Sequence, residues 1–170
     1  MRKEVLRQEQ VIRTIKRMTH EIIERNIDLD HIVFVGILNK GLPLAERIQS
    51  YMKHFTHKDL PVYGLNIVAY RDDSKKASIS KEDNIFDITD KHVILVDDVL
   101  YTGRSVRAAM DALIKHGRPK SIQLAILIDR GHRELPIRAD FIGKNIPTSH
   151  SENIFVDMEK LEVYIESKNP

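Results

Sequence analysis

The spacing of apolar residues along the chain predicts three helices. Between residues 9 and 26, apolar side chains recur every three or four positions, and the polar side chains between them fall on the opposite side. Residues 42–55 and 105–116 show the same period, and Gly117 marks the end of the third segment. Each predicted helix therefore has one apolar face that can pack against a core.

Short apolar runs lie between these helices. A run that is apolar on both faces is typical of a strand buried within a parallel sheet. The strands predicted in this way are 31–38, 61–70, 91–96 and 121–128, with shorter ones at 141–142, 154–156 and 161–165. Strands that alternate with helices predict an α/β fold, with a mainly parallel twisted sheet flanked by helices.

Residues 71–90 interrupt this alternation. They begin with Arg-Asp-Asp, contain several lysines and serines, and include few apolar side chains. A polar stretch of this length inside a compact domain is usually a functional lid or a disordered segment. We expect a flexible lid loop here, with Arg71 at its base.

Length and composition fit one domain, residues 1–170, with a substantial core. No apolar segment approaches the roughly 20 residues of a membrane span, and no signal-peptide pattern is present, so we expect a cytoplasmic protein without membrane contact. The chain has no cysteine, which excludes disulfides and thiolate metal sites. Its net charge of +2 is too small to indicate a nucleic-acid binder by itself.

Polar segments follow three of the predicted strands. They are 39–41, 97–105 and 129–133. Because ligands of open α/β sheets bind outside the carboxyl ends of the strands, we expect these segments to meet at one rim of the sheet and to form the binding site.

The segment 97–105 combines two chemical features. Asp97 and Asp98 follow the apolar residues 93–96, and paired carboxylates at the end of a strand fit the vicinal hydroxyls of a ribose with Mg²⁺ nearby. Thr102-Gly103-Arg104-Ser105 then opens a helix, whose unpaired N–H groups and positive end favour a phosphate. The two features together predict a ribose 5-phosphate site. A phosphorelay receiver domain also carries paired acids, but it carries them at its first strand.

Three stretches resemble a known family. Residues 93–105 resemble the phosphoribosyl pyrophosphate (PRPP) signature of type I phosphoribosyltransferases, and VILVDDVLYTGRSVRAAMDAL, SIQLAILIDRGHRELPIRADFIGKNIPTS and THEIIERN are similar to the PyrR family. The resemblance implies a type I phosphoribosyltransferase fold with a small hood. It also implies an RNA-binding regulator of transcription termination in pyrimidine genes, which converts uracil and PRPP to UMP and pyrophosphate with Mg²⁺.

The resemblance assigns roles to individual positions. Asp97 and Asp98 would hold the ribose hydroxyls close to Mg²⁺, and Arg71 would add positive charge as a lid closes. The other substrate-binding positions that it implies are Asn39, Lys40, Gly41, Val99, Leu100, Tyr101, Thr102, Gly103, Arg104, Ser105, Arg130 and Ile154. Within this set, residues 39–41 would face pyrophosphate, and Arg130 and Ile154 would line the base pocket.

A basic surface is the second implied site. Arg17 and His20 lie on one predicted helix face, and the matching RNA-binding positions of the family are Arg17, His20, Arg133, Arg138 and Lys144. The expected partner is a hairpin in an mRNA leader, with UMP or UTP tuning its affinity. We expect a homodimer or a larger homo-oligomer.

Two alternatives stay open at this point. The family pattern suggests a Lys-Thr-Arg-Gly-like pyrophosphate loop, where this chain has Leu38-Asn39-Lys40-Gly41 and a short lid. Lysine does not replace the fork of an arginine, so a regulator that binds RNA and nucleotide with weak or no turnover is one alternative. A purine phosphoribosyltransferase is the other, although the run Asp-Arg-Gly-His-Arg at 129–133 disfavours it.

Overall fold

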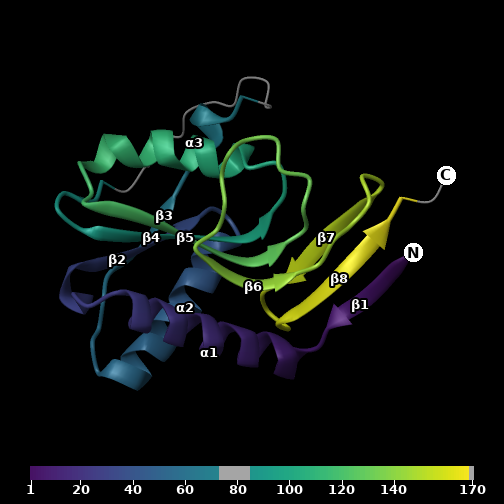
Figure 1. The fold of residues 1–170 in the computed structure, drawn as a ribbon, viewed down its shortest axis with the longest axis horizontal. Helices are drawn as coiled ribbons and strands as arrows, with labels where there is room; N and C mark the ends of the chain where they lie inside the picture. Colours follow the sequence, from purple (N-terminus) through teal and green to yellow (C-terminus); the bar gives the residue numbers. More distant parts are fainter. Residues whose placement is uncertain (73–84, 169–170) are drawn as a thin grey trace.

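The computed structural model describes residues 1–72 and 85–168. Its centre is a five-stranded sheet in the order β3-β2-β4-β5-β6, in which every neighbouring pair is parallel. Helix α3 covers one face and helices α1 and α2 cover the other (Figure 1). The expected α/β fold with a parallel sheet flanked by helices is confirmed.

The predicted helices are observed with small shifts of their ends. They are α1 (Gln8–Arg25), α2 (Gly41–Thr56) and α3 (Arg104–Leu113), and a 3₁₀ turn, η3 (Ile114–His116), continues α3 to Gly117. The strands of the parallel sheet are β2 (Ile32–Ile37), β3 (Val62–Leu65), β4 (His92–Leu100), β5 (Ser121–Asp129) and β6 (Phe141–Asn145). No helix within the described ranges is long and apolar enough to cross a membrane.

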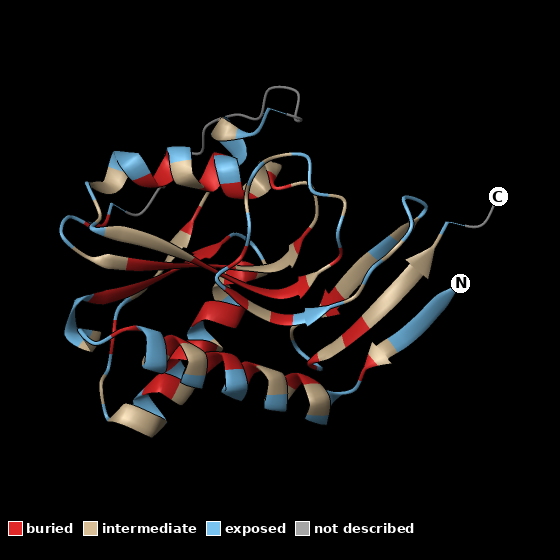
Figure 2. Cartoon of the chain, in the orientation of Figure 1, coloured by how far each residue is buried: buried red, intermediate tan, exposed pale blue. Residues whose placement is uncertain are grey.

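The apolar runs of the sequence are explained by burial on both faces of the sheet (Figure 2). In β2, Phe34 belongs to the core under α1 and α2, whereas Val35 belongs to the core under α3. In β4, Ile94 and Leu95 divide in the same way. Because successive side chains of a strand point to opposite faces, a strand between two helical layers must be apolar at nearly every position.

A second, antiparallel sheet stands beside the carboxyl ends of the parallel strands (Figure 1). Its order is β1-β8-β7, with β1 at Arg2–Leu6, β7 at Glu152–Asp157 and β8 at Glu162–Ser167. It forms the expected hood. Strand β1 was not expected, because its Arg-Lys-Glu-Val-Leu sequence lacks an apolar alternation and only Leu6 is buried.

Two predicted boundaries were wrong. The strand expected at 61–70 ends at Leu65, because the Asn66 side chain accepts the N–H of Val68 at 3.0 Å and starts a 3₁₀ turn, η2 (Val68–Tyr70). The strand expected at 91–96 continues to Leu100, since β5 is long enough to pair with it through Asp129. The acid pair Asp97 and Asp98 therefore lies inside the last half of β4, not beyond its end.

The polar stretch 71–90 is described only at its two ends. The lid expected there falls mainly on residues 73–84, which lie outside the described residues. Its last part is not polar in structure, because Phe86 is buried between the rings of Tyr63 and His116 with centroid distances of 4.5 and 3.9 Å. Ile88 is fully buried as well. This end of the stretch is therefore anchored in the core under α3.

Candidate functional site

The acid pair of β4 is held by its own backbone. The Asp97 carboxylate accepts the N–H of Asp98 at 2.9 Å, and the Asp98 carboxylate accepts the N–H of Val99 at 2.9 Å. Both side chains are only partly exposed. Two carboxylates are thus fixed next to each other at the rim of the sheet, as a ribose-binding pair requires.

This arrangement changes the proton affinity of one acid. Burial of its side chain raises the pKa of Asp97 well above the ordinary value of 3.8, and the neighbouring Asp98 raises it further. The positive charge of Arg71 acts in the opposite direction. A cation or hydroxyl donors at this position would therefore relieve an unfavourable charge.

The segment 39–41 lies against the acid strand because of a glycine. A Cβ atom on Gly41 would lie under 3.0 Å from the Val96 carbonyl oxygen, so only glycine lets the start of α2 approach β4 this closely. The preceding Leu38–Asn39 peptide bond is cis. The Lys40 ammonium lies 3.8 Å from the centroid of the Phe155 ring of β7, which places it between the parallel sheet and the hood. No pattern in the sequence predicted this contact with Phe155.

A cavity of about 290 Å³ opens at the turn between β4 and α3. Gly103 has a φ of +94°, the left-handed region that favours glycine, and it lets the chain turn into α3. The Arg104 N–H donates to Thr102 Oγ1 at 3.3 Å. The residues that line this cavity, called the phosphate cavity below, are Arg71, Val99, Leu100, Tyr101, Thr102, Gly103, Arg104, Ser105, Val106 and Glu134. The structure therefore brings Arg71 together with all of the expected positions 99–105.

Two carboxylates balance the positive charge of this cavity. Arg104 forms an ion pair with Asp72 at 2.7 Å and a longer one with Glu134 at 3.8 Å, and Arg107 lies 3.6 Å from the same Asp72 oxygen. Sequence reasoning did not single out Glu134. Its only signal was its place just after the rim segment 129–133.

Arg130 is nearly completely buried, at 5% exposure. Its guanidinium donates to Thr148 Oγ1 at 2.9 Å and to the carbonyls of Ser149 and Glu152, and it lies 4.0 Å from the centroid of the Tyr101 ring. The side chain expected to line the base pocket therefore holds the segment that leads into β7. Ile154, the other expected base contact, is half-buried in β7.

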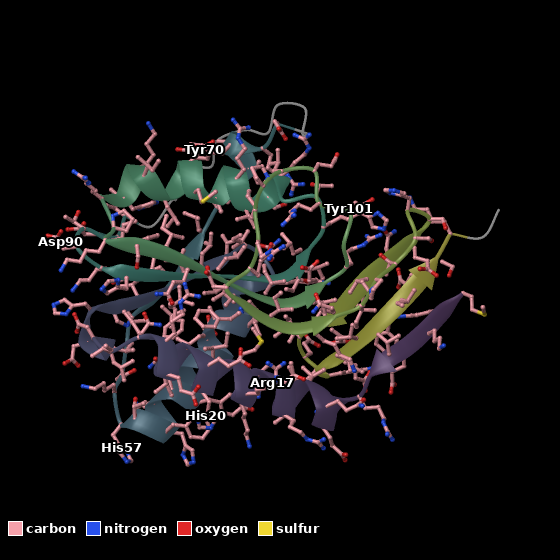
Figure 3. All side chains as sticks on the ribbon, viewed as in Figure 1. Arg17, His20, His57, Tyr70, Asp90 and Tyr101 are labelled. Carbon is pink, nitrogen blue, oxygen red and sulfur yellow. The ribbon has the colours of Figure 1, made fainter. Side chains whose placement is uncertain are left out.

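Tyr101 connects the phosphate cavity to two histidines that sequence reasoning missed. Its hydroxyl lies 3.2 Å from Nδ1 of His150, and its ring meets the His132 ring edge-on with a centroid distance of 5.7 Å. His132 also contacts the carbonyl of Thr148. Figure 3 shows Tyr101 on the side of the parallel sheet that faces the hood. The wall of the site is thus built from several segments that are far apart in sequence.

The expected RNA-binding residues come from α1, from the segment between β5 and β6, and from β6 itself, an edge strand of the parallel sheet. Arg17 of α1 donates to the carbonyls of Ile142 and Gly143 and pairs with Glu21. Gly143 makes this approach possible, since a Cβ atom there would lie 2.9 Å from the Thr14 methyl group. Arg17 and His20 lie along α1 in Figure 3. The structure therefore places α1 directly against the strand that carries Lys144.

The remaining cations are exposed near this edge. Arg133 and Arg138 line a second cavity, of about 400 Å³, and Lys144 is exposed on β6. Within residues 1–72 and 85–168, no ion pair involves any of these three cations. His20 is placed differently, because its ring stacks on Phe55 of α2 at a centroid distance of 4.2 Å. The five expected positions are all exposed, and they are called the β6 surface below.

Comparison with protein families gives one match over most of the chain. The model of the phosphoribosyl transferase domain matches residues 1–161. Two curated relatives are both named bifunctional protein PyrR. One, from Ligilactobacillus salivarius, is 53% identical over 156 residues and covers 88% of each chain. The other, from Streptococcus pneumoniae, is 52% identical over 160 residues, which are 94% of this chain and 92% of that protein.

Solved structures show the same fold at low sequence identity. A hypoxanthine phosphoribosyltransferase of Trypanosoma cruzi superposes with a TM-score of 0.75 and 16% identity, over 98% of this chain and 97% of its own. A hypoxanthine-guanine phosphoribosyltransferase of Bacillus anthracis gives 0.68 and 22%, over 85% of this chain and 83% of its own. At such identities the likeness shows the fold alone.

Proposed function

The chain belongs to the phosphoribosyl transferase domain family and, within it, to the PyrR proteins, and we propose that it is a bifunctional regulator of pyrimidine genes that also makes UMP from uracil and PRPP. We also propose that all 170 residues form one phosphoribosyltransferase-like domain, which agrees with the match of the family model to residues 1–161. One observation supports the enzymatic part most strongly. The acid pair lies in β4 directly before residues 99–106, which line the phosphate cavity, so groups suited to ribose hydroxyls and to a phosphate are neighbours along one stretch of the chain.

The residues divide the work of phosphoribosyl transfer among them. Asp97 and Asp98 accept hydrogen bonds from the ribose hydroxyls, and their charge favours the positive charge that develops on the sugar ring. The N–H groups at the start of α3 hold the 5′-phosphate, with the hydroxyls of Thr102 and Ser105. Residues 39–41 face the leaving pyrophosphate, and Arg71 adds positive charge beside it.

The chain's own donors fit a Mg²⁺ ion that is shared with substrate. No group of three or more potential metal-ligating side chains occurs among the residues that the structure describes. Magnesium is commonly held by one or two carboxylates together with phosphate oxygens, and Asp97 and Asp98 provide such a pair. When bound with PRPP, the ion supplies positive charge against the pyrophosphate and against the two acids.

The uracil pocket lies between the end of β5 and the hood. Ile154 offers an apolar contact to the base, and Arg130 acts here by fixing the segment 148–152 beside it. Uracil presents alternating donors and acceptors that backbone groups can read. The base specificity therefore resides in the shape of this wall more than in one charged side chain.

The second function is binding of an mRNA leader hairpin on the β6 surface. Its five positions are Arg17, His20, Arg133, Arg138 and Lys144. Arginine and lysine contact RNA phosphates, and unpaired loop bases supply sequence recognition. UMP or UTP in the nucleotide site changes RNA affinity, and a homodimer or larger homo-oligomer extends the surface.

An assay of UMP formation from uracil, PRPP and Mg²⁺ tests the enzymatic part. Turnover with uracil, and none with hypoxanthine or guanine, is the expected result. A sensor without turnover is the second candidate, and the position of Lys40 favours it. Its ammonium lies on the Phe155 ring instead of presenting an arginine fork to pyrophosphate. Nucleotide binding without UMP formation would select this candidate.

A further inference from the structure

The second cavity, of about 400 Å³, has a floor made by three neighbouring strands. Leu100 of β4 is in register with Asp129 of β5, and Asp129 is in register with Asn145 of β6. Residues in register on parallel strands present their side chains to the same face of the sheet. An apolar group, a carboxylate and an amide therefore form one row at the carboxyl end of the sheet.

The walls add charge and further apolar surface. Arg133 and Arg138 line the cavity together with Ile137 and Ile142. The Asp129 carboxylate is fixed, because its Oδ1 accepts the N–H of Gly131 at 3.0 Å. The cavity thus combines a fixed acceptor, an amide, two guanidinium groups and apolar side chains, which is more than a phosphate contact needs.

We propose that this cavity binds one unpaired guanine of the RNA, an inference that rests on the RNA-binding function proposed above. Guanine carries two adjacent donors on its Watson–Crick edge, which a carboxylate accepts, and two acceptors on its Hoogsteen edge, which arginine binds bidentately. Adenine does not carry two adjacent donors on its Watson–Crick edge, so it cannot bind a carboxylate in this way. The apolar walls contact the faces of the base, and the flanking cations hold the neighbouring phosphates.

Hairpin RNAs with one common stem test this proposal. One loop contains only adenines, and the others contain a single guanine at each loop position in turn. We expect the wild-type protein to bind one guanine-containing loop about 10-fold more tightly than the all-adenine loop, within the range given by a good bidentate base contact. Asp129→Asn should remove most of this preference and leave binding of the all-adenine loop unchanged.

A second variant tests the same cavity without removing the Asp129 carboxylate, which holds the N–H of Gly131. Arg138→Lys keeps the charge and removes the fork, so the guanine preference should fall while the salt dependence of binding persists. A guanine preference that survives in both variants, or equal affinity for all loops in the wild type, would overturn the assignment of this cavity. Failure of every hairpin to bind would instead contradict the RNA-binding function itself.

A separate set of contacts joins the phosphate cavity to the β6 surface. The Thr102 carbonyl accepts the N–H of Glu134 at 2.9 Å and that of Leu135 at 3.3 Å. The Ile137 side chain lies where a Cβ on Gly103 would touch it, at 3.5 Å. The segment 131–138 carries two cations of the β6 surface. It is therefore in direct contact with Thr102 and Gly103, which line the phosphate cavity.

The ion pair between Arg104 and Glu134 would be affected by a phosphate bound in the phosphate cavity. Arg104 pairs with Glu134, and both side chains line the cavity that would hold the 5′-phosphate. A bound phosphate competes with the Glu134 carboxylate for Arg104 and also repels that carboxylate. We infer that loss of this pair on nucleotide binding repositions the segment 131–138 and so couples nucleotide to RNA affinity, a regulation that likewise rests on the proposed function.

Measurement of RNA affinity with and without UMP tests the coupling. In the wild type we expect UMP to change the dissociation constant of a leader hairpin at least 5-fold, the lower end of ordinary coupling. Glu134→Gln should reduce this ratio to less than about 2-fold and give the UMP-free protein the affinity of the UMP-bound wild type.

Glu159→Gln is the matched control, because Glu159 is exposed on the turn between β7 and β8. It should retain the wild-type ratio. An unchanged ratio in Glu134→Gln would overturn the role of this ion pair. Absence of any UMP effect in the wild type would instead contradict nucleotide control as such.

Discussion

At the scale of single residues, the acid pair lowers the stability of the folded chain at a position suited to ligand binding. Asp97 directly follows the buried apolar residues 93–96 of β4, and the cost of this position appears as a raised pKa. No packing requirement explains two adjacent carboxylates at this point. The proposed ligands would account for them, since ribose hydroxyls and a cation would satisfy two carboxylates that otherwise destabilise the folded chain.

The first prediction concerns the pH dependence of stability. The raised pKa of Asp97 means that the folded chain holds this proton more tightly than the unfolded chain, so ionisation lowers the free energy of unfolding as pH rises above 3.8. Asp97→Asn should therefore be more stable than the wild type at about pH 7, and the difference should shrink as pH falls toward 3.8. Urea unfolding at several pH values measures it. A variant less stable than the wild type at neutral pH would refute this reading.

The second prediction concerns catalysis at the same position. Asp97→Asn combined with Asp98→Asn should lower kcat/KM for UMP formation by at least about 100-fold, the usual effect of removing groups that stabilise developing charge. Circular dichroism serves as the control for an intact fold. An unchanged rate would remove the ribose-binding role from this pair.

The third prediction concerns Arg130. Its loss removes a donor from Thr148 Oγ1 and from the carbonyls of Ser149 and Glu152, so Arg130→Met should lower the free energy of unfolding by about 2–4 kcal/mol. Arg130→Lys keeps the positive charge but lacks the planar guanidinium, so its free energy of unfolding should lie between those of the wild type and Arg130→Met. Equal stability of all three proteins would show that the guanidinium does not hold this segment.

At the scale of elements, the approach of α2 to β4 sets the geometry of the site. The fourth prediction is that Gly41→Ala forces this helix away from the Val96 carbonyl, lowers stability by about 1–3 kcal/mol and weakens PRPP binding. Gly64→Ala is the matched control, because its Cβ would meet mainly the flexible end of the Leu38 side chain. Denaturant unfolding and titration with PRPP compare the two. Equal effects would contradict a special role for the close approach at Gly41.

Periodicity predicted the elements with buried faces and missed those without them. The helices and the central strands have apolar patterns imposed by two cores, so their ends fell close to the observed ones. Strand β1 lacks such a pattern, since it is a charged edge strand held by pairing with β8. The extent of β4 depended on β5 as its neighbour. Both features depend on partners distant in sequence.

The same limit applies to the site. Residues 97–105 could be predicted as a binding turn because acids, glycine and hydroxyl groups stand together in one stretch. The contacts of Glu134 with Arg104 and of Phe155 with Lys40 join segments more than 20 residues apart, so no local pattern could indicate them. The hydrogen bonds of the buried Arg130 side chain with the segment 148–152 could not be predicted from a local pattern for the same reason.

At the scale of the whole molecule, the two proposed sites lie on either side of the segment that follows β5. The phosphate cavity and the second cavity share Leu100, and each is lined by part of the segment 131–138, with Glu134 at the first cavity and Arg133 and Arg138 at the second. Strand β6 also lines the second cavity, through Ile142 and Asn145. The proposed nucleotide site and the proposed RNA site therefore share Leu100 and the segment 131–138.

The fifth prediction concerns charge on the β6 surface. Arg138→Ala should weaken hairpin binding and reduce the slope of log K against log salt concentration by about 1, while PRPP binding stays intact. Arg118→Ala removes the same charge from an exposed position just before β5, at the opposite end of the sheet, and should change neither quantity. Equal loss of RNA and PRPP binding in Arg138→Ala would mean that the surface is misplaced.

A crystal structure with bound UMP tests the central claim most directly, because both proposed functions require a phosphoribosyl group at the end of β4. The expected result is a 5′-phosphate within hydrogen-bonding distance of the N–H groups at residues 103–105, with the ribose hydroxyls facing Asp97 and Asp98. A nucleotide bound elsewhere, or a phosphate cavity that remains without one at saturating UMP, would contradict the enzyme and the sensor alike.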